Sequence, residues 1–79
     1  MNILLFGIAR EIVGTDTLTV PENDLPQTVG GLRKWLQEHY PAFGGLSSLA
    51  IAVDSNYAAD DDLLDVKNEI ALIPPVSGG

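Results

Sequence analysis

The sequence predicts a single α+β domain in which one main helix covers one face of a mixed β-sheet. Three patterns carry this prediction: continuous apolar segments near both ends of the chain, one segment of alternating polarity, and one segment with helical spacing. A chain of 79 residues with 46% hydrophobic side chains can form one small core. The sequence contains no internal repeat and no linker, so one domain is expected.

Two strands are expected before the helix. Residues 3–6 are continuously apolar, as in a strand buried in the middle of a sheet. Residues 17–20 alternate in polarity, which is typical of a half-buried strand that returns antiparallel after a turn at residues 14–16. Residues 6–14 predict a strand that leads into a short helical turn with solvated charged side chains.

The helix is expected to begin after Thr28, which is a favourable N-cap. It should end at Tyr40, because Pro41 disfavours the helical conformation at the residue before it. Gly30 and Gly31 are poor helix formers in the first turn and indicate either close packing or looseness at this end. The apolar residues of the segment share one face: Val29, Leu32, Leu36 and Tyr40.

Two further strands follow the helix. Residues 50–53 are continuously apolar, and residues 69–73 form the last strand, which Pro74 and Pro75 end because neither can donate to a β-ladder. The order strand, strand, helix, strand, strand, with a crossover through the helix, makes the first and last strands parallel and central. This is the β-grasp arrangement of ubiquitin, and it leaves the other sheet face uncovered as a docking surface.

The composition favours a protein partner. Four basic and eleven acidic side chains give a net charge of −7, which disfavours nucleic acids and anionic membranes and favours basic proteins, although such a surface also serves solubility alone. Without cysteine the chain has no thiolate metal site and no cysteine nucleophile. No apolar run approaches the ~20 residues of a membrane span, and the first residues do not form a basic leader, so a cytoplasmic location is expected.

Neither a metal site nor a catalytic histidine is predicted. Asp54, Asn56 and residues 60–62 invite a calcium interpretation, but the glycine and the closing glutamate of an EF-hand loop are missing. We interpret these acidic residues as a solvated loop. His39 has no serine, cysteine or paired carboxylate near it in sequence, so a structural or surface role is expected.

The reactive group is expected at the end of the chain. Residues 1–73 form the domain, and residues 74–79 form an extended tail that ends in Gly78 and Gly79. The two prolines stiffen the start of this tail, and at ~3.3 Å per residue it reaches about 20 Å. A carboxylate is a poor electrophile, and adenylation with ATP would activate it. Because the chain has no phosphate loop, a partner must supply this activation.

The sequence resembles the small subunit of molybdopterin synthase, a sulfur-carrier family with a ubiquitin-like fold. The most specific part is residues 71–79, Ala-Leu-Ile-Pro-Pro-Val-Ser-Gly-Gly, which are similar to the family's apolar strand and Pro-Pro-Val-Ser/Thr-Gly-Gly end. The pattern Phe-x-x-x-Arg-Glu-x-x-Gly at residues 6–14 also fits, as does Tyr-Pro at residues 40–41. Two positions depart from the family: Gly7 replaces the usual alanine, and Lys-Asn-Glu at residues 67–69 replaces an Asp-Gly-Asp-Glu turn.

The resemblance implies a function in sulfur transfer. An E1-like enzyme would use ATP to adenylate Gly79, and a sulfur source would convert the carboxylate to a thiocarboxylate, giving 1-thioglycine. The tail would then enter the large synthase subunit, where sulfur passes to a cyclic pterin phosphate precursor to form the molybdopterin dithiolene. The carrier itself would bind no cofactor and would not be catalytic alone. It would act as the sulfur-donating subunit of a heterotetramer.

The resemblance also implies the site residues. Gly78 and Gly79 would carry the chemistry. An uncovered sheet face would dock the partner, and an aromatic pair with a branched aliphatic would make credible anchors there. Alternatively, Phe6 lies in the core. The implied partner-binding residues are Phe6, Tyr57, Ile73, Pro74, Pro75, Val76 and Ser77.

Three other functions remain open. One is a sulfur carrier for thiamine synthesis or tRNA thiolation, although those relatives usually lack Pro-Pro-Val-Ser before Gly-Gly. Another is a ubiquitin-like modifier that is joined to lysines of target proteins. The last is a β-grasp binding module with an inert tail.

Overall fold

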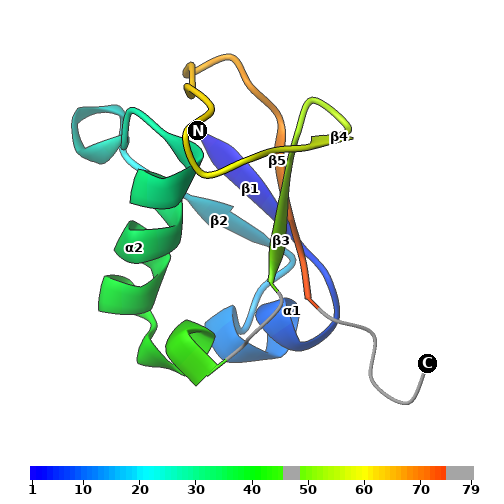
Figure 1. Cartoon of the computed structure of the whole chain (residues 1–79). Helices are drawn as coiled ribbons and strands as arrows, with labels where there is room; N and C mark the ends of the chain where they lie inside the picture. Colours follow the sequence, from blue (N-terminus) through cyan, green and yellow to red (C-terminus); the bar gives the residue numbers. More distant parts are fainter. Residues whose placement is uncertain (46–48, 75–79) are drawn as a thin grey trace.

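The computed structural model of the chain describes residues 1–45 and 49–74 (Figure 1). Two short 3₁₀ segments, η1 (Glu22–Asp24) and η2 (Pro41–Gly45), flank the longer helix. The helices and strands are β1 (Asn2–Leu5), α1 (Gly7–Val13), β2 (Thr17–Thr19), α2 (Val29–His39), β3 (Ala50–Val53), β4 (Asn56–Tyr57) and β5 (Ile70–Ile73).

The five strands form one mixed sheet in the order β2-β1-β5-β3-β4. The inner pair, β1 and β5, is parallel, and the other pairs are antiparallel. In the parallel pair, Leu5 lies opposite Leu72. The sheet confirms the prediction that the first and last strands are parallel and inside the sheet.

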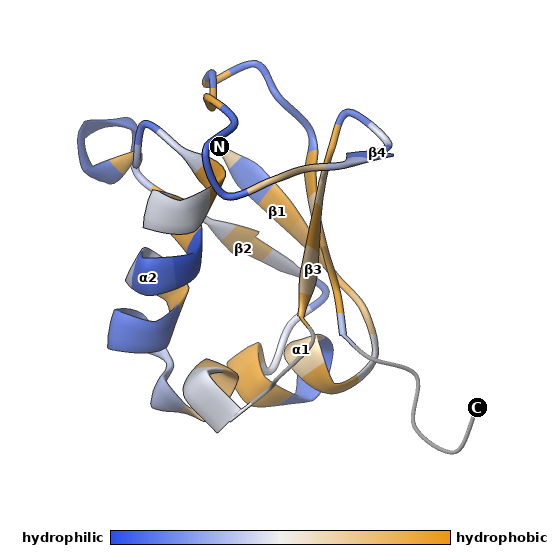
Figure 2. Cartoon of the chain, in the orientation of Figure 1, coloured by the Kyte–Doolittle hydropathy of each residue, from blue (hydrophilic) through white to orange (hydrophobic). Residues whose placement is uncertain are grey.

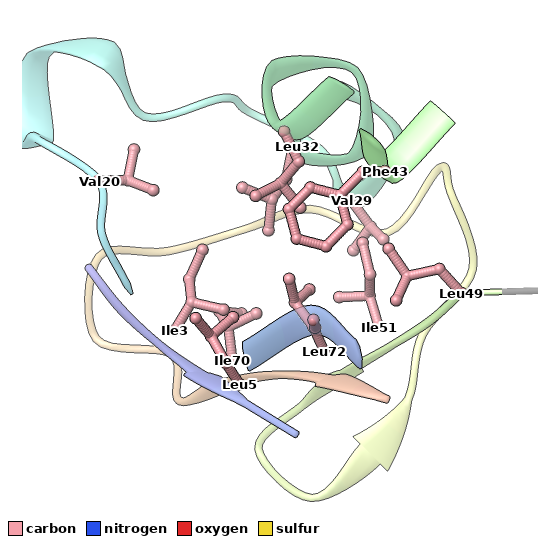
Figure 3. Packing of buried hydrophobic residues seen from close by; sticks show 12 residues of the cluster. Ile3, Leu5, Val20, Val29, Leu32, Phe43, Leu49, Ile51, Ile70 and Leu72 are labelled. Atoms are coloured by element: carbon pink, nitrogen blue, oxygen red, sulfur yellow. The ribbon is translucent and has the colours of Figure 1, made fainter. Parts of the chain in front are cut away.

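One face of the sheet packs against α2, as Figure 1 shows. Figure 2 shows that the side of α2 turned toward the sheet is hydrophobic and that its outer side is hydrophilic, which is the amphipathic pattern the spacing predicts. Figure 3 shows the buried side chains between the two layers. The core consists of Ile3, Leu5, Ala9, Val20, Val29, Leu32, Leu36, Phe43, Leu49, Ile51, Ile70 and Leu72.

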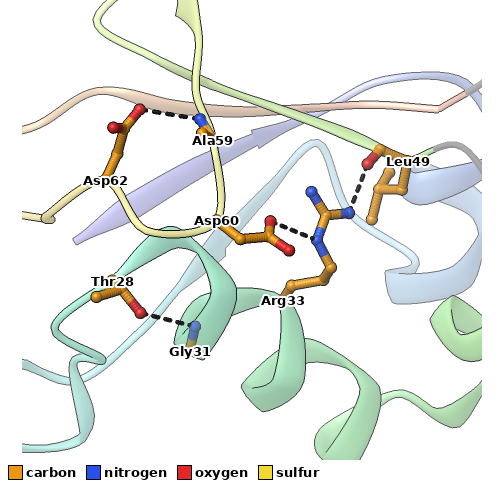
Figure 4. A network of polar contacts seen from close by, with 7 residues as sticks. All are labelled: Thr28, Gly31, Arg33, Leu49, Ala59, Asp60 and Asp62. Carbon is orange, nitrogen blue, oxygen red and sulfur yellow. Dashed lines mark hydrogen bonds and ion pairs between the residues drawn. The ribbon is translucent and has the colours of Figure 1, made fainter.

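Backbone N–H groups in the first turn of α2 make two polar contacts, and Figure 4 shows the one with Thr28. The Gly31 N–H donates to the Thr28 side chain at 3.1 Å, which confirms the predicted N-cap. The Gly30 N–H donates to the Asp60 carbonyl at 2.8 Å, and a Cβ on Gly30 would lie 3.1 Å from that oxygen. A Cβ on Gly31 would lie 3.0 Å from Pro26. The two glycines therefore reflect close packing rather than looseness.

Arg33 joins α2 to two other segments (Figure 4). Its Nε donates to Asp60 Oδ1 at 3.2 Å, and its Nη1 donates to the Leu49 carbonyl at 2.5 Å. Arg33 thus connects α2 to the loop before β5 through Asp60 and to the residue before β3, Leu49.

Two elements differ from the expectation. The segment after β1 is a seven-residue helix, α1, rather than a short turn, and it ends at Gly14 with a φ of 91°. Three strands follow the helix where two were expected: Asp54 and Ser55, with φ of 50° and 71°, form a tight turn after β3, and the additional strand β4 begins directly afterwards. Aspartate tolerates this left-handed region better than most residues, and such turns match the twist of a hairpin.

Candidate functional site

The face of the sheet opposite α2 carries a row of side chains across four strands. Leu4 in β1 pairs with Ala71 in β5. Ala71 pairs in turn with Ala52 in β3, which pairs with Tyr57 in β4. Paired residues of neighbouring strands project from the same face, so these four side chains line up. The middle of the row is two alanines, and its ends are larger side chains.

The two alanines in the middle of this row line a hollow of about 320 Å³. Phe6 lies two residues beyond Leu4, and Ile73 lies two residues beyond Ala71, so both project from the same face as the row. The hollow is lined by Leu4, Phe6, Ala52, Ser55, Tyr57, Glu69, Ala71 and Ile73.

The open face exposes two aromatic side chains. Phe6 is 50% exposed and Tyr57 is 75% exposed. Phe6 is therefore not part of the core, and the alternative that the sequence left open is decided in favour of the surface. The docking patch implied by the family resemblance, Phe6, Tyr57 and Ile73, is brought together around one hollow. An exposed apolar depression of this kind is typical of a protein-docking site.

Asp54 makes hydrogen bonds beside Ser55 and Glu69, the two polar residues that line the hollow. Its carboxylate accepts from the Glu69 N–H at 2.8 Å and from the Asn68 side chain at 2.7 Å. The Asp54 N–H donates to the Glu69 carbonyl at 2.8 Å. These bonds tie the β3–β4 turn to the residues directly before β5.

The expectation of a merely solvated acidic loop is therefore incomplete. Asp62 accepts from the Ala59 N–H at 2.9 Å, and Asp60 pairs with Arg33 at 3.2 Å (Figure 4). Together with Asp54, these carboxylates stabilise turns and loop attachments. Within residues 1–45 and 49–74, no group of three or more histidine or acidic side chains is arranged to hold a metal ion.

His39 lies on the outer side of α2. Its ring stacks on Trp35, with centroids 4.0 Å apart and an angle of 21° between the planes. Its Nδ1 lies 2.9 Å from the Trp35 carbonyl oxygen. The predicted surface role is confirmed, because the side chain is exposed and contacts its own helix.

The tail begins at the rim of the hollow. Ile73 ends β5 and lines the hollow, and Pro74 is the last residue that the structure describes. The other predicted tail residues, Pro75, Val76, Ser77, Gly78 and Gly79, lie outside the described residues. Neither helix in the described ranges has the length and apolarity needed to cross a bilayer.

Sequence reasoning missed five of the lining residues. Counting back by two from Phe6 and Ile73 would have found Leu4, Ala71 and Glu69, because alternate residues of a strand share a face. Ala52 follows only from the pairing of β3 with β5. Ser55 lies in the tight turn between β3 and β4, and β4 was not among the expected strands.

Comparisons with known proteins agree with this fold. Residues 3–79 match the ThiS family. A molybdopterin synthase sulfur carrier subunit from Caenorhabditis briggsae is 36% identical over 85 residues, with 100% of this chain and 96% of the relative covered. The protein of the same name from Dictyostelium discoideum is 35% identical over 84 residues, with 99% and 94% covered.

A solved structure supports the fold independently. The small archaeal modifier protein 1 from Methanosarcina acetivorans aligns with a TM-score of 0.80 and 26% sequence identity, and 99% of this chain and 94% of that chain are covered. This similarity and the strand order confirm the predicted β-grasp arrangement.

Proposed function

This chain belongs to the ThiS family, and we propose that it acts as the sulfur-carrier subunit of a molybdopterin synthase. The observation that carries the proposal is the continuity between the hollow and the tail. Ile73 lines the hollow, and the next residue, Pro74, begins the segment that leads to Gly78 and Gly79. A partner that binds the hollow would also receive the tail. Similarity over the whole chain to relatives named sulfur carrier subunits supports this function.

The proposed chemistry takes place on the backbone carboxylate of Gly79. This group is ionised at neutral pH and resists nucleophilic attack. On an E1-like enzyme its oxygen would attack the α-phosphorus of ATP, and pyrophosphate would leave. A sulfur donor would then displace AMP to give a thiocarboxylate, which is 1-thioglycine at position 79. The use of ATP is consistent with a cytoplasmic location.

In the large subunit, the thiocarboxylate would give its sulfur to a cyclic pterin phosphate precursor. The sulfur would displace an oxygen substituent from a carbon of the precursor, which forms a thioester with Gly79. Water would hydrolyse this thioester, so the sulfur stays on the precursor for the dithiolene and the carboxylate of Gly79 is restored. Gly78 adds no side chain beside the reacting group, and Val76 and Ser77 would contact the walls of the partner's channel. The carrier would thus be a sulfurtransferase only as part of the complex, which we expect to be a heterotetramer.

Docking would depend on the open sheet face. Phe6 and Tyr57 present large apolar surfaces beside the hollow. Aromatic anchors of this kind contribute most of the binding energy in many interfaces. The net charge of −7 would increase the association rate with a basic partner, most strongly at low ionic strength. Hydrophobic anchoring and charge attraction therefore favour the same class of partner.

A protein modifier is the second candidate function. The specific observation in its favour is the structural similarity to small archaeal modifier protein 1. A modifier would use the same activated carboxylate, but a lysine amine would attack the Gly79 carbonyl and displace the activating group, forming an isopeptide bond. A sulfur carrier for thiamine synthesis or tRNA thiolation would share the thiocarboxylate and differ only in its acceptor.

Intact-mass spectrometry tests these functions directly. The chain would be incubated with an E1-like enzyme, ATP and sulfide, and we expect a mass increase equal to one sulfur-for-oxygen exchange at Gly79. Adducts to other proteins would instead support a modifier. If neither product forms, the carrier function is wrong.

Two variants define the requirement for the terminal carboxylate. Deletion of Gly79, or addition of one residue after it, should abolish sulfur loading, because the carboxylate is then displaced from the activating site. The far-UV circular dichroism should stay unchanged, since the described core contains no residue beyond Leu72. Pterin conversion by either variant together with the large subunit would contradict the proposed role.

A further inference from the structure

One charged side chain faces the hollow on the open side of the sheet. Among the described residues that line this hollow, Glu69 alone has a charged side chain. It lies directly before β5 and projects from the same face as Ala71 and Ile73, because alternate residues of a strand share a face. The carboxylate of Glu69 therefore adjoins a depression whose wall is mainly apolar.

The hollow has an apolar end and a charged end. Ile73 ends β5 where the tail begins, and Phe6 lines the hollow directly after β1. Since β1 and β5 are parallel, both residues lie toward the end of the sheet from which the tail leaves. Glu69 precedes Ile73 by four residues, which corresponds to about 13 Å at ~3.3 Å per residue. The charge thus lies at the end of the open face that is remote from the tail.

The fold engages the main chain of Glu69 but not its carboxylate. Its N–H donates to the Asp54 carboxylate at 2.8 Å, and its carbonyl accepts from the Asp54 N–H at 2.8 Å. In the described part of the chain, the two ion pairs involve Asp16 and Asp60, not Glu69. The side chain is therefore held at a fixed place beside the hollow and is available for an intermolecular contact.

We propose that Glu69 determines the specificity of the docking face by pairing with a lysine or arginine of the large subunit, an inference that rests on the proposed carrier function. The partner would place an apolar side chain over Ala52 and Ala71 and its cation beside Glu69. A pair enclosed in an apolar hollow attracts more strongly than one at an open surface, because less water screens it. A second copy of this chain is a poor occupant, since it brings the same net charge of −7.

The pair would also fix the direction of docking. A partner bound the other way round would bring its cation against Phe6 and Ile73 and would leave Glu69 without a partner. Both charges would then lose water without gaining a compensating contact, which costs free energy and disfavours this orientation. Only the orientation that pairs Glu69 brings Ile73, and with it Pro74, to the channel that receives the tail.

The first experiment compares Glu69→Gln with Glu38→Gln. Both changes remove one negative charge from an exposed glutamate and keep its size, but Glu38 lies in α2, on the other side of the sheet. In isothermal titration calorimetry with the large subunit, we expect Glu69→Gln to raise the Kd about tenfold. Glu38→Gln should raise it less than about twofold. Both variants should keep the unfolding midpoint, because the hydrogen bonds of Glu69 to Asp54 come from its main chain.

The outcomes of this comparison separate the two proposals. Equal losses in the two glutamine variants, or no loss in either, would overturn the pairing of Glu69 and leave the carrier function intact. If the unmodified chain does not bind the large subunit at all, the proposed function fails, and the pairing fails with it.

Salt and binding rates distinguish a direct pair from long-range attraction. An enclosed pair is screened little, so the loss in Glu69→Gln should persist at high ionic strength and appear mainly as faster dissociation. The small loss in Glu38→Gln should disappear with added salt and appear only in the association rate. Surface plasmon resonance at low and high ionic strength measures both rates. A loss in Glu69→Gln that salt abolishes and that is confined to association would overturn the proposal.

Charge reversal and a double-mutant cycle locate the partner's cation. Glu69→Lys places two like charges together and should raise the Kd at least about 100-fold. Each lysine and arginine near the channel of the large subunit would be changed to alanine in turn and combined with Glu69→Gln. One of these changes should cause little further loss in the double variant, because both substitutions remove the same contact. That residue should lie about 13 Å from the mouth of the channel. Additive losses at every position would contradict the proposed pair.

Discussion

The two faces of the sheet are made by the same strands and are built differently. Toward α2, the strands present branched aliphatic side chains that are fully or almost fully buried, such as Ile3, Ile70 and Leu72. Away from α2, the same strands present two alanines, and larger side chains surround them. The first face fills space and stabilises the domain, whereas the second leaves a hollow. Alternate residues of one short strand can therefore serve folding and docking separately.

The largest effect on stability should come from the covered face. Leu72→Ala removes a fully buried side chain and should lower the free energy of unfolding by about 2–5 kcal/mol, a large share of the stability of so small a domain. Urea denaturation measures this loss. Ile73→Ala, one residue later and on the open face, should cost less than about 1 kcal/mol. Equal losses in the two variants would contradict the division between the faces.

The next effect concerns binding through the open face. Tyr57→Asp should weaken binding to the large subunit about 30-fold, as expected for the loss of an aromatic anchor, and should leave the unfolding midpoint nearly unchanged. Isothermal titration calorimetry gives the affinity. Leu63→Asp is the matched control, because Leu63 is 78% exposed and Tyr57 75%, yet Leu63 does not line the hollow. Similar losses in both variants would argue against a localised docking face.

The smallest effect on stability is expected at Arg33, a polar residue of α2. Arg33→Ala removes the hydrogen bonds to Asp60 and to the Leu49 carbonyl and should cost about 1–2 kcal/mol of unfolding free energy. Affinity for the large subunit should stay within about twofold, since Arg33 does not line the hollow. Lys34→Ala, an exposed neighbour with the same charge, is the control and should change neither quantity. A stability loss in Lys34→Ala equal to that in Arg33→Ala would assign the effect to net charge.

Much of the covered layer could be predicted from the sequence, because its signals are local. The cap at Thr28 and the spacing from Val29 to Tyr40 predict α2, and the structure places the helix at Val29–His39. Continuous apolar segments near both ends of the chain predict the inner strands β1 and β5. The family is likewise indicated by a local signal, the Pro-Pro-Val-Ser-Gly-Gly pattern of the tail.

The open face was harder to predict, because it depends on pairing between distant strands. In residues 3–6 every side chain is apolar, so the alternation that separates Leu5 from Phe6 is hidden in the sequence. β4 has only two residues, which is too short for any periodicity to appear. Ala52 and Ala71 lie side by side in the hollow because β3 and β5 pair in this register, and no local sequence pattern predicts that pairing.

The inner position of β5 has a mechanical consequence. This strand is hydrogen-bonded to β1 on one side and to β3 on the other, and the tail continues directly from its end. A force that pulls the tail along the strand direction is therefore shared by two ladders in shear. An edge strand would transmit the same force to a single ladder. A partner can thus pull strongly on the tail without first detaching β5 from the sheet.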